Sequence, residues 1–151
     1  MTTGTTLVTL KQQLRDALQA LPGLASAQIT YGYPGENAIT GKDIWMADAE
    51  SENHIAVIKA GTKKVDETLA LSLIIQVLKT AGEGQEAADL EAVELFSEVQ
   101  QLFARSPQIS PSIMWAQIAR WSHKTGAYSG NESSHGSRFE VTVTARARLG
   151  G

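Results

Sequence analysis

The chain has 151 residues, of which 42% are hydrophobic and 19% are charged. These values suit one folded domain and exclude a disordered chain, which is poorer in hydrophobic residues. Thirteen Lys and Arg against sixteen Asp and Glu give a net charge of −3, which argues against a main role in gripping nucleic acid phosphates. The absence of cysteine excludes disulfides and thiolate metal sites.

The sequence offers no export or membrane signal. The first ten residues lack a basic segment followed by a continuous apolar one. The longest apolar stretch, Leu69–Leu78, is interrupted by Ser72 and Gln76 and is shorter than the roughly 20 residues of a membrane-spanning helix. We therefore expect a protein that stays in the cytoplasm where it is made.

The first predicted elements are a helix and a strand. Residues 6–21 place apolar side chains three and four positions apart, which predicts an amphipathic helix that Pro22 and Gly23 end. Thr5 or Thr6 can cap its start. Residues 25–33 change to a period of two, which predicts a half-buried strand.

Three further strands are expected before the next helix. The first two span 42–48 and 53–60, and the polar segment Asp48–Asn53 is predicted to be the hairpin loop between them. After a polar turn at Gly61–Lys64, residues 66–79 alternate with Leu, Ile and Val at the odd positions, which predicts a central strand.

The C-terminal third predicts a helix and two strands. Residues 85–105 have a helical apolar period and an acidic outer face. Residues 113–123 fit either a helix or a strand. We favour a strand because the Gly- and Ser-rich segment 125–137, predicted to be a flexible loop, can connect it to the alternating residues 138–149 as a hairpin.

This order of elements predicts an α+β fold. Short turns between successive strands favour an antiparallel or mixed sheet of about five to six strands, packed against the N-terminal helix and one long helix. Neither an internal repeat nor a linker divides the chain, so residues 1–151 are expected to form a single domain.

No catalytic constellation is evident in the sequence. His54, His123 and His135 are scattered without metal-ligand spacing, and no serine lies in a Gly-x-Ser-x-Gly motif. Gly82-Glu83-Gly84 lacks the residues of a phosphate-binding loop. We therefore expect neither an enzyme nor a bound cofactor or metal.

Charged residues of the last strand and the long helix are candidates for contacts between subunits. Three arginines and a glutamate share the polar face of strand 138–149, and the helix 85–105 presents acidic residues. One molecule therefore carries surface charges of both signs, as head-to-tail contacts between identical subunits need. A solvated surface explains them equally well. The candidates are Arg138, Glu140, Arg146 and Arg148 on the strand, and Glu91, Glu94 and Glu98 on the helix.

Taken together, these elements resemble the tail terminator, or tail completion, proteins of long-tailed bacteriophages, of the minor tail protein U type. The resemblance rests on the helix Leu7–Leu21 that ends in Pro-Gly, the strand Ala27–Tyr33 and the later elements. These later elements are the hairpin Gly41–Lys59, the strand Glu67–Leu78, the helix Gln85–Arg105 and the strand Arg138–Arg148, which follows a Gly- and Ser-rich loop.

The resemblance implies a virion protein that acts by binding. Its subunits would form a ring, a hexamer in this family, on the head-proximal end of the tail tube, after assembly in the host cytoplasm. The ring would stop the addition of tube subunits and offer a surface to the neck or head–tail connector proteins. Genomic DNA would pass through its lumen without being read. No membrane is implied.

Three other functions fit the sequence. The nearest is another virion protein, such as a head–tail connector or a tube subunit. The second is a small ligand-binding or enzymatic α+β domain, with a pocket lined by Tyr31, Tyr33, Trp45 and Trp115. The third is a binder of single-stranded nucleic acid, for which Trp45, Trp115, Trp121 and the three tyrosines are the candidate stacking residues.

Overall fold

The computed structural model describes residues 5–59, 62–80, 82–107, 109, 113–126 and 134–149. Their elements, in chain order, are α1 (Leu7–Gln19), the 3-10 turn η1 (Pro22–Leu24), β1 (Gln28–Thr30), the 3-10 turn η2 (Glu36–Ala38), β2 (Lys42–Lys59), β3 (Thr62–Thr80), α2 (Gly84–Arg105), β4 (Ile113–Gly126) and β5 (Ser134–Leu149).

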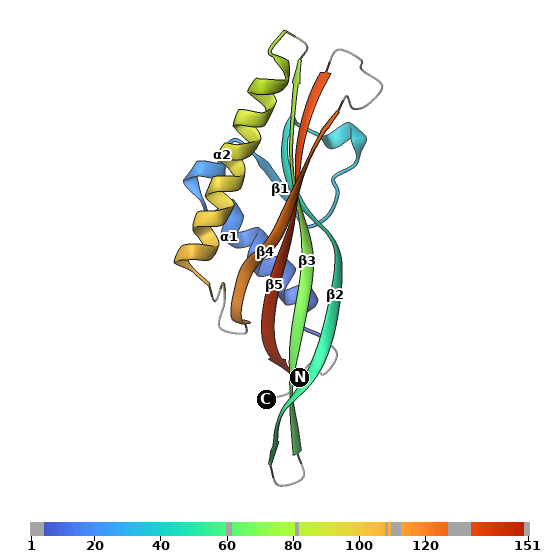
Figure 1. The fold of residues 1–151 in the computed structure, drawn as a ribbon, viewed down its shortest axis with the longest axis vertical. Helices are drawn as coiled ribbons and strands as arrows, with labels where there is room; N and C mark the ends of the chain where they lie inside the picture. Colours follow the sequence, from blue (N-terminus) through green and yellow to red (C-terminus); the bar gives the residue numbers. More distant parts are fainter. Residues whose placement is uncertain are drawn as a thin grey trace.

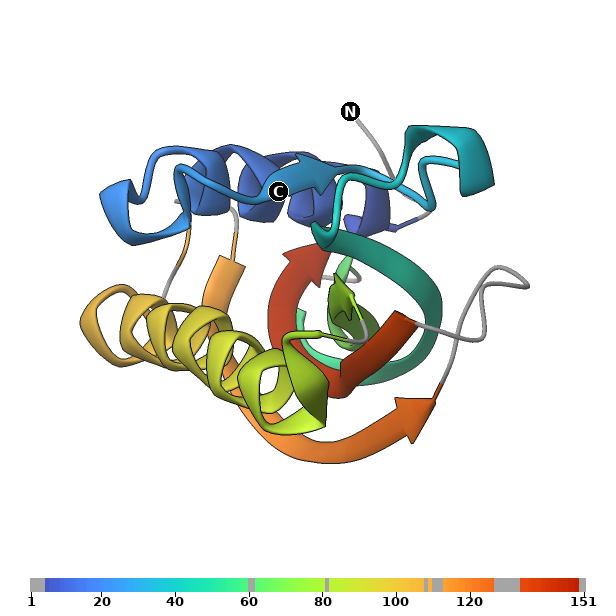
Figure 2. The same cartoon turned by 90° about the horizontal axis from the view of Figure 1, so that it is seen from above.

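The strands form one mixed sheet in the order β1-β2-β3-β5-β4. Only the short β1 runs parallel to its neighbour, and the other three pairs are antiparallel. The long strands run along the long axis of the molecule, with both helices beside them (Figure 1). Seen along that axis, the strands curve strongly past the helices (Figure 2). The predicted α+β fold is confirmed.

The core lies between the helices and one face of the sheet. The odd-numbered residues of β3 from Leu69 to Val77 and of β5 from Phe139 to Ala147 are buried, and the pairing of Leu71 with Val143 puts the two rows on the same face. Leu10, Leu14 and Leu18 of α1 and seven residues of α2 join the same cluster. The predicted alternation and both predicted helix faces are therefore confirmed.

The predicted hairpin loop at Asp48–Asn53 is wrong. This segment lies inside β2, where Ala49 to Asn53 pair in order with Leu71 to Glu67 of β3. It contains neither glycine nor proline, and its acidic residues alternate with Ala49 and Ser51, so it can pair as a strand. A bulge between Met46 and Ala49 absorbs the irregularity.

Other boundaries also differ from the sequence prediction. β3 begins at Thr62, within the predicted polar turn, because it pairs with β2 as far as Lys59. β1 keeps only three residues of the predicted strand 25–33.

The predicted hairpin at the C-terminus is confirmed, with a shorter loop than expected. Residues 113–123 are a strand, and β4 continues to Gly126. Residues 134–137, predicted to belong to the flexible loop, pair instead with Thr80 to Val77 of β3. The rest of that loop, residues 127–133, lies outside the described residues. Neither α1 nor α2 is both long and apolar enough to cross a membrane.

Candidate assembly surfaces

The face of the sheet that turns away from the helices carries the charged residues of β5. We call it the open face. Arg138, Glu140 and Arg146 alternate there with the buried core residues, as the sequence predicts, and all three are half-buried. The backbone of Arg148 pairs with Asp66, and its side chain lies outside the described part of the structure.

Arg138 is held within the subunit. Its Nε and Nη2 donate to Gln76 Oε1 at 3.1 and 2.6 Å, and its guanidinium lies 5.6 Å from the centre of the Trp45 ring. Trp45 is itself buried against Tyr33, with ring centres 5.2 Å apart. These contacts join the start of β5 to β2, to β3 and to Tyr33, which follows β1.

The two other charged side chains of β5 also have partners in the same subunit. Arg146 donates through Nε and Nη2 to Asp66 Oδ2 at 3.0 and 2.9 Å, and the Asp66 side chain is only 3% exposed. Lys124 Nζ lies 3.0 Å from Glu140 Oε2 on the neighbouring strand. No local sequence pattern marks Gln76 and Asp66 as the partners of Arg138 and Arg146, because they lie 62 and 80 residues away along the chain.

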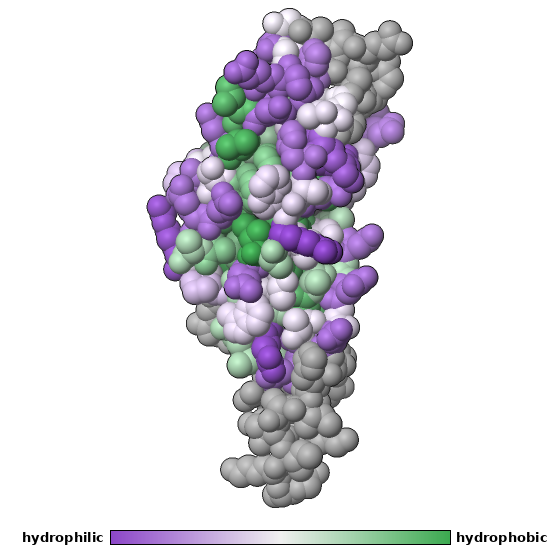
Figure 3. Space-filling view, in the orientation of Figure 1, coloured by the Kyte–Doolittle hydropathy of each residue, from purple (hydrophilic) through white to green (hydrophobic). Residues whose placement is uncertain are grey.

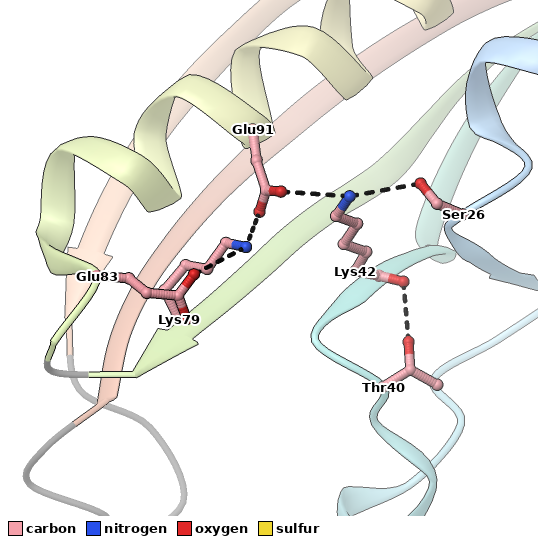
Figure 4. Close-up of polar contacts among 6 residues, drawn as sticks. All are labelled: Ser26, Thr40, Lys42, Lys79, Glu83 and Glu91. Carbon is pink, nitrogen blue, oxygen red and sulfur yellow. Dashed lines mark hydrogen bonds and ion pairs between the residues drawn. The ribbon is translucent and has the colours of Figure 1, made fainter.

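Glu91 of α2 lies between two lysines of the sheet (Figure 4). Its carboxylate is 2.6 Å from Lys79 Nζ and 3.3 Å from Lys42 Nζ. Lys79 also contacts Glu83 at 3.4 Å, and Lys42 reaches Ser26 Oγ at 3.4 Å. This ion-pair cluster fastens the first half of α2 to β2 and β3.

The pKa values of this cluster are shifted in opposite directions. Burial alone would raise the pKa of Glu91, but hydrogen bonds from Lys79 and Lys42, together with their charges, lower it below its usual value. The hydrogen bond to Glu91 raises the pKa of Lys79, against the opposing effect of desolvation. A carboxyl group whose pKa is lowered by folding stabilises the fold above its unfolded-state pKa, and this stability is lost as the pH falls.

We expect Glu91→Gln to reduce the free energy of unfolding at pH 7 by about 1.5 to 3 kcal/mol, the range for a hydrogen bond to a charged group. The difference from the parent should shrink between about pH 5 and pH 3, as Glu91 itself takes up a proton. Urea unfolding of both proteins at several pH values measures this difference in the free energy of unfolding. Glu94→Gln is the matched control, because Glu94 is exposed and has no ion-pair partner among the described residues. Equal losses in both variants would contradict the prediction.

The three acidic candidates of α2 therefore differ. Glu91 is used inside the subunit, and the Glu98 carboxyl group packs so closely on Gly23 that any side chain there would overlap it. Glu94 is exposed on the outer side of the helix.

A serine, a histidine and an aspartate meet where α2 crosses the end of β4 and the start of β5. His123 Nε2 lies 2.7 Å from Ser137 Oγ and 3.4 Å from Asp89 Oδ1. Burial alone would raise the pKa of Asp89. Hydrogen bonds from Gln85 and Ser137, together with the nearby His123, lower this pKa below its usual value. In a catalytic triad the hydroxyl and the acid contact different ring nitrogens. Here both contact the same one, and Ser137 is fully buried, so the three side chains join α2 to β4 and β5.

A groove of about 650 Å³ lies between α2 and the edge strand β4. Its lining includes Phe103, Ala104, Ile118 and Trp121. Trp121 packs edge-on against the rings of Phe96 and Phe139, yet it remains 53% exposed. Hydrophobic side chains gather on this side of the molecule between polar ones (Figure 3). Two more apolar side chains of α2 are exposed, Leu90 at 59% and Val93 at 48%.

The open face has a shallow trough of small side chains along its middle. Ala70 and Ser72 of β3 pair with Thr144 and Thr142 of β5 there. Acidic residues of β2 border the trough on one side and Arg120 of β4 on the other. A cavity of about 140 Å³ is lined by Asp48, Ala49, Glu50, Ala70, Ser72, Arg120 and Thr142, and one of about 430 Å³ continues past Ser51, Glu52 and Thr68.

The four aromatic residues of the ligand-binding alternative do not gather in one pocket. Tyr33 contacts Trp45, whereas the ring of Tyr31 lies under Lys11, 4.4 Å from its Nζ. Trp115 pairs with Arg146 of β5, whereas Trp45 is level with Glu140 of the same strand. These two positions are six residues apart, so the two tryptophans are separated by about 20 Å along the strand. The described residues contain no cluster that could hold a metal ion.

No protein-family model and no curated protein matches the sequence. Among solved structures, a chain of the virion of a native gene transfer agent particle has a similar fold. The two chains share 13% identity and a TM-score of 0.50, and the match covers 92% of this chain and 94% of that one. At this identity the likeness establishes a shared fold over nearly the whole of both chains.

Proposed function

We propose that this protein is a virion structural protein of a tailed phage or phage-like particle. Within the virion, we propose that it forms a ring on the head-proximal end of the tail tube. The ring would end polymerisation of the tube and bind the neck or head–tail connector protein.

The observation that carries this proposal is the fold. It matches a chain of a gene transfer agent virion over more than nine tenths of both chains. Most of the elements that resemble tail terminators are present in the structure, namely the N-terminal helix, the central strand β3, the long helix α2 and the closing strand β5, whereas residues 42–59 form one strand instead of the expected hairpin. The sequence pattern and the fold therefore both favour a particle component.

The proposed mechanism is binding without catalysis. One end of the ring would complement the last ring of the tube, and the other end would not accept another tube subunit. The net charge of −3 suits a ring through which DNA slides, because a strongly basic lumen would retain the phosphates. The shared ring nitrogen in the cluster of His123, Ser137 and Asp89 supports a structural role for these residues.

Deletion of the gene from its genome, followed by negative-stain electron microscopy of the lysate, tests the proposal. We expect overlong headless tubes beside filled heads, and tails of normal length when the gene is returned on a plasmid. Tails of normal length that fail to join heads would show that the protein is a head–tail connector instead of a terminator. Loss of all tubes would make the protein a tube subunit, and intact particles would refute the virion role.

A further inference from the structure

The sheet ends at two free edges of opposite charge. We propose that β4 of one copy pairs with β2 of the next, so that one sheet continues from subunit to subunit. This inference rests on the proposed ring and names the contact that closes it.

The outer edge of β4 is available over most of its length. Within the part of the chain that the structure describes, β4 is the last strand of the sheet and pairs only with β5. Near its start the Ala116 amide donates to the Pro107 carbonyl, and from residue 119 to 126 every residue is exposed. A free strand edge presents unpaired backbone donors and acceptors, which favour another strand as their partner.

The edge of β2 is covered by β1 only from Asp43 to Trp45. Beyond this point, acidic and small residues alternate along β2. Glu50 and Glu52 lie on the open face, opposite Ala70 and Thr68, whereas Ala49 pairs with the core residue Leu71 on the helix side. This edge is therefore acidic on one face and small on the other.

The edge of β4 has the complementary character on the same two faces. Arg120 and Lys124 lie on the open face, opposite Thr142 and Arg138. Arg120 makes no ion pair among the described residues, and the Lys124 side chain is 59% exposed although it contacts Glu140. On the helix side, the groove holds the half-exposed Trp121, against which small residues such as Ala49 can pack.

Strand direction and level also agree. Successive antiparallel pairs make β4 run opposite to β2, so a neighbour related by rotation about an axis along the strands adds an antiparallel pair. Gln117 lies on one rung with Thr144, Ala70 and Glu50. The free stretches of the two edges therefore meet at similar heights around Gln117 and Arg120. Lys124 lies on the rung of Asp43, where β1 covers the edge of β2.

Like edges do not suit each other. Two β4 edges would bring Arg120 and Lys124 of both copies together, and two β2 edges would oppose acidic rows. The contact is therefore head-to-tail, the type that builds closed rings when its rotation closes.

Disulfide cross-linking tests this contact directly, because the chain has no cysteine of its own. Gln117→Cys protein is mixed with protein carrying Asp48→Cys, Glu50→Cys or Glu52→Cys, which scans the register. We expect a disulfide-linked dimer from at least one mixture, and a ladder of bands that stops at the ring number when both cysteines lie in one chain. Dimers formed by Gln117→Cys protein alone with equal yield would overturn the head-to-tail arrangement.

The same cross-linking is carried out in particles from the deletion strain complemented with the double-cysteine gene. Normal tails without any cross-link would overturn the edge pairing and leave the terminator function standing. If deletion instead leaves particles intact, the proposed function fails, and cross-linking of concentrated purified protein still decides the contact.

Charge exchange gives a second test. With Gln117→Cys and Glu52→Cys as the cysteine pair, Arg120→Glu with Lys124→Glu should abolish the cross-link, and adding Asp48→Lys with Glu50→Lys to the same chain should restore it. Arg15→Glu on α1 is the matched control and should leave the yield unchanged. Thermal unfolding verifies that each variant is folded. A folded double variant at β4 that cross-links as well as the parent refutes the charge complementarity.

Discussion

Glu67→Ala is expected to lower the free energy of unfolding by about 3 kcal/mol, the upper end of the range for hydrogen bonds to a charged group. Glu67 of β3 is 1% exposed and lies beneath the start of α1. Its carboxyl oxygens accept hydrogen bonds from the Thr6 backbone amide at 2.9 Å, from Thr6 Oγ1 at 2.9 Å and from Thr5 Oγ1 at 2.5 Å. A carboxylate at this end also complements the helix dipole.

Chemical denaturation measures the loss, and a fall in melting temperature of roughly 6 to 12 °C should accompany it for a chain of this size. Glu50→Ala is the matched control, because it removes an exposed glutamate from the neighbouring strand. A double-mutant cycle of Glu67→Ala with Thr6→Val should show strong non-additivity. Additive losses would mean that the contact contributes little.

Phe139→Ala should cost about 3 to 5 kcal/mol, the range for removing a buried phenylalanine ring. Phe139 is 4% exposed at the centre of an aromatic cluster. Its ring centre lies 4.8 Å from those of Phe96 and His123 and 5.4 Å from that of Trp121. The substitution would leave a cavity where α2, β4 and β5 meet.

Urea unfolding compares this variant with two others. Phe139→Leu keeps most of the volume and should cost less than about 1.5 kcal/mol. Val93→Ala changes a half-exposed residue of α2 and should cost less than about 0.5 kcal/mol. If Phe139→Ala is no worse than Val93→Ala, the aromatic cluster does not hold the hairpin to the helix.

Much of the candidate surface could be anticipated from sequence, and its partners could not. The alternation of residues 138–149 predicts that Arg138, Glu140 and Arg146 share a face, because side chains alternate along any strand. Which residue each one meets depends on the neighbouring strand. Gln76, Asp66 and Lys124 are brought beside them only by the sheet register, so their pairing left no local signal.

The polar segment Asp48–Asn53 also shows that local sequence does not reveal a contact with a distant strand. A run of acidic and polar residues is typical of a turn when it is judged alone. In the sheet this run pairs with β3, while its acidic side chains point to the open face. The ladder of β3 and the solvent on that face decide the conformation, and neither is visible in the segment itself.

The sequence by itself determined the two helices, the long alternating strands and the α+β class, because these follow from periodicity between residues a few positions apart. The tertiary structure alone decided the order of the strands, the two free edges and the burial of Glu67 under α1. The pairing of β3 with β5 and the contact of Glu67 with Thr6 join residues 54 or more positions apart, which meet only when the whole sheet forms around its core.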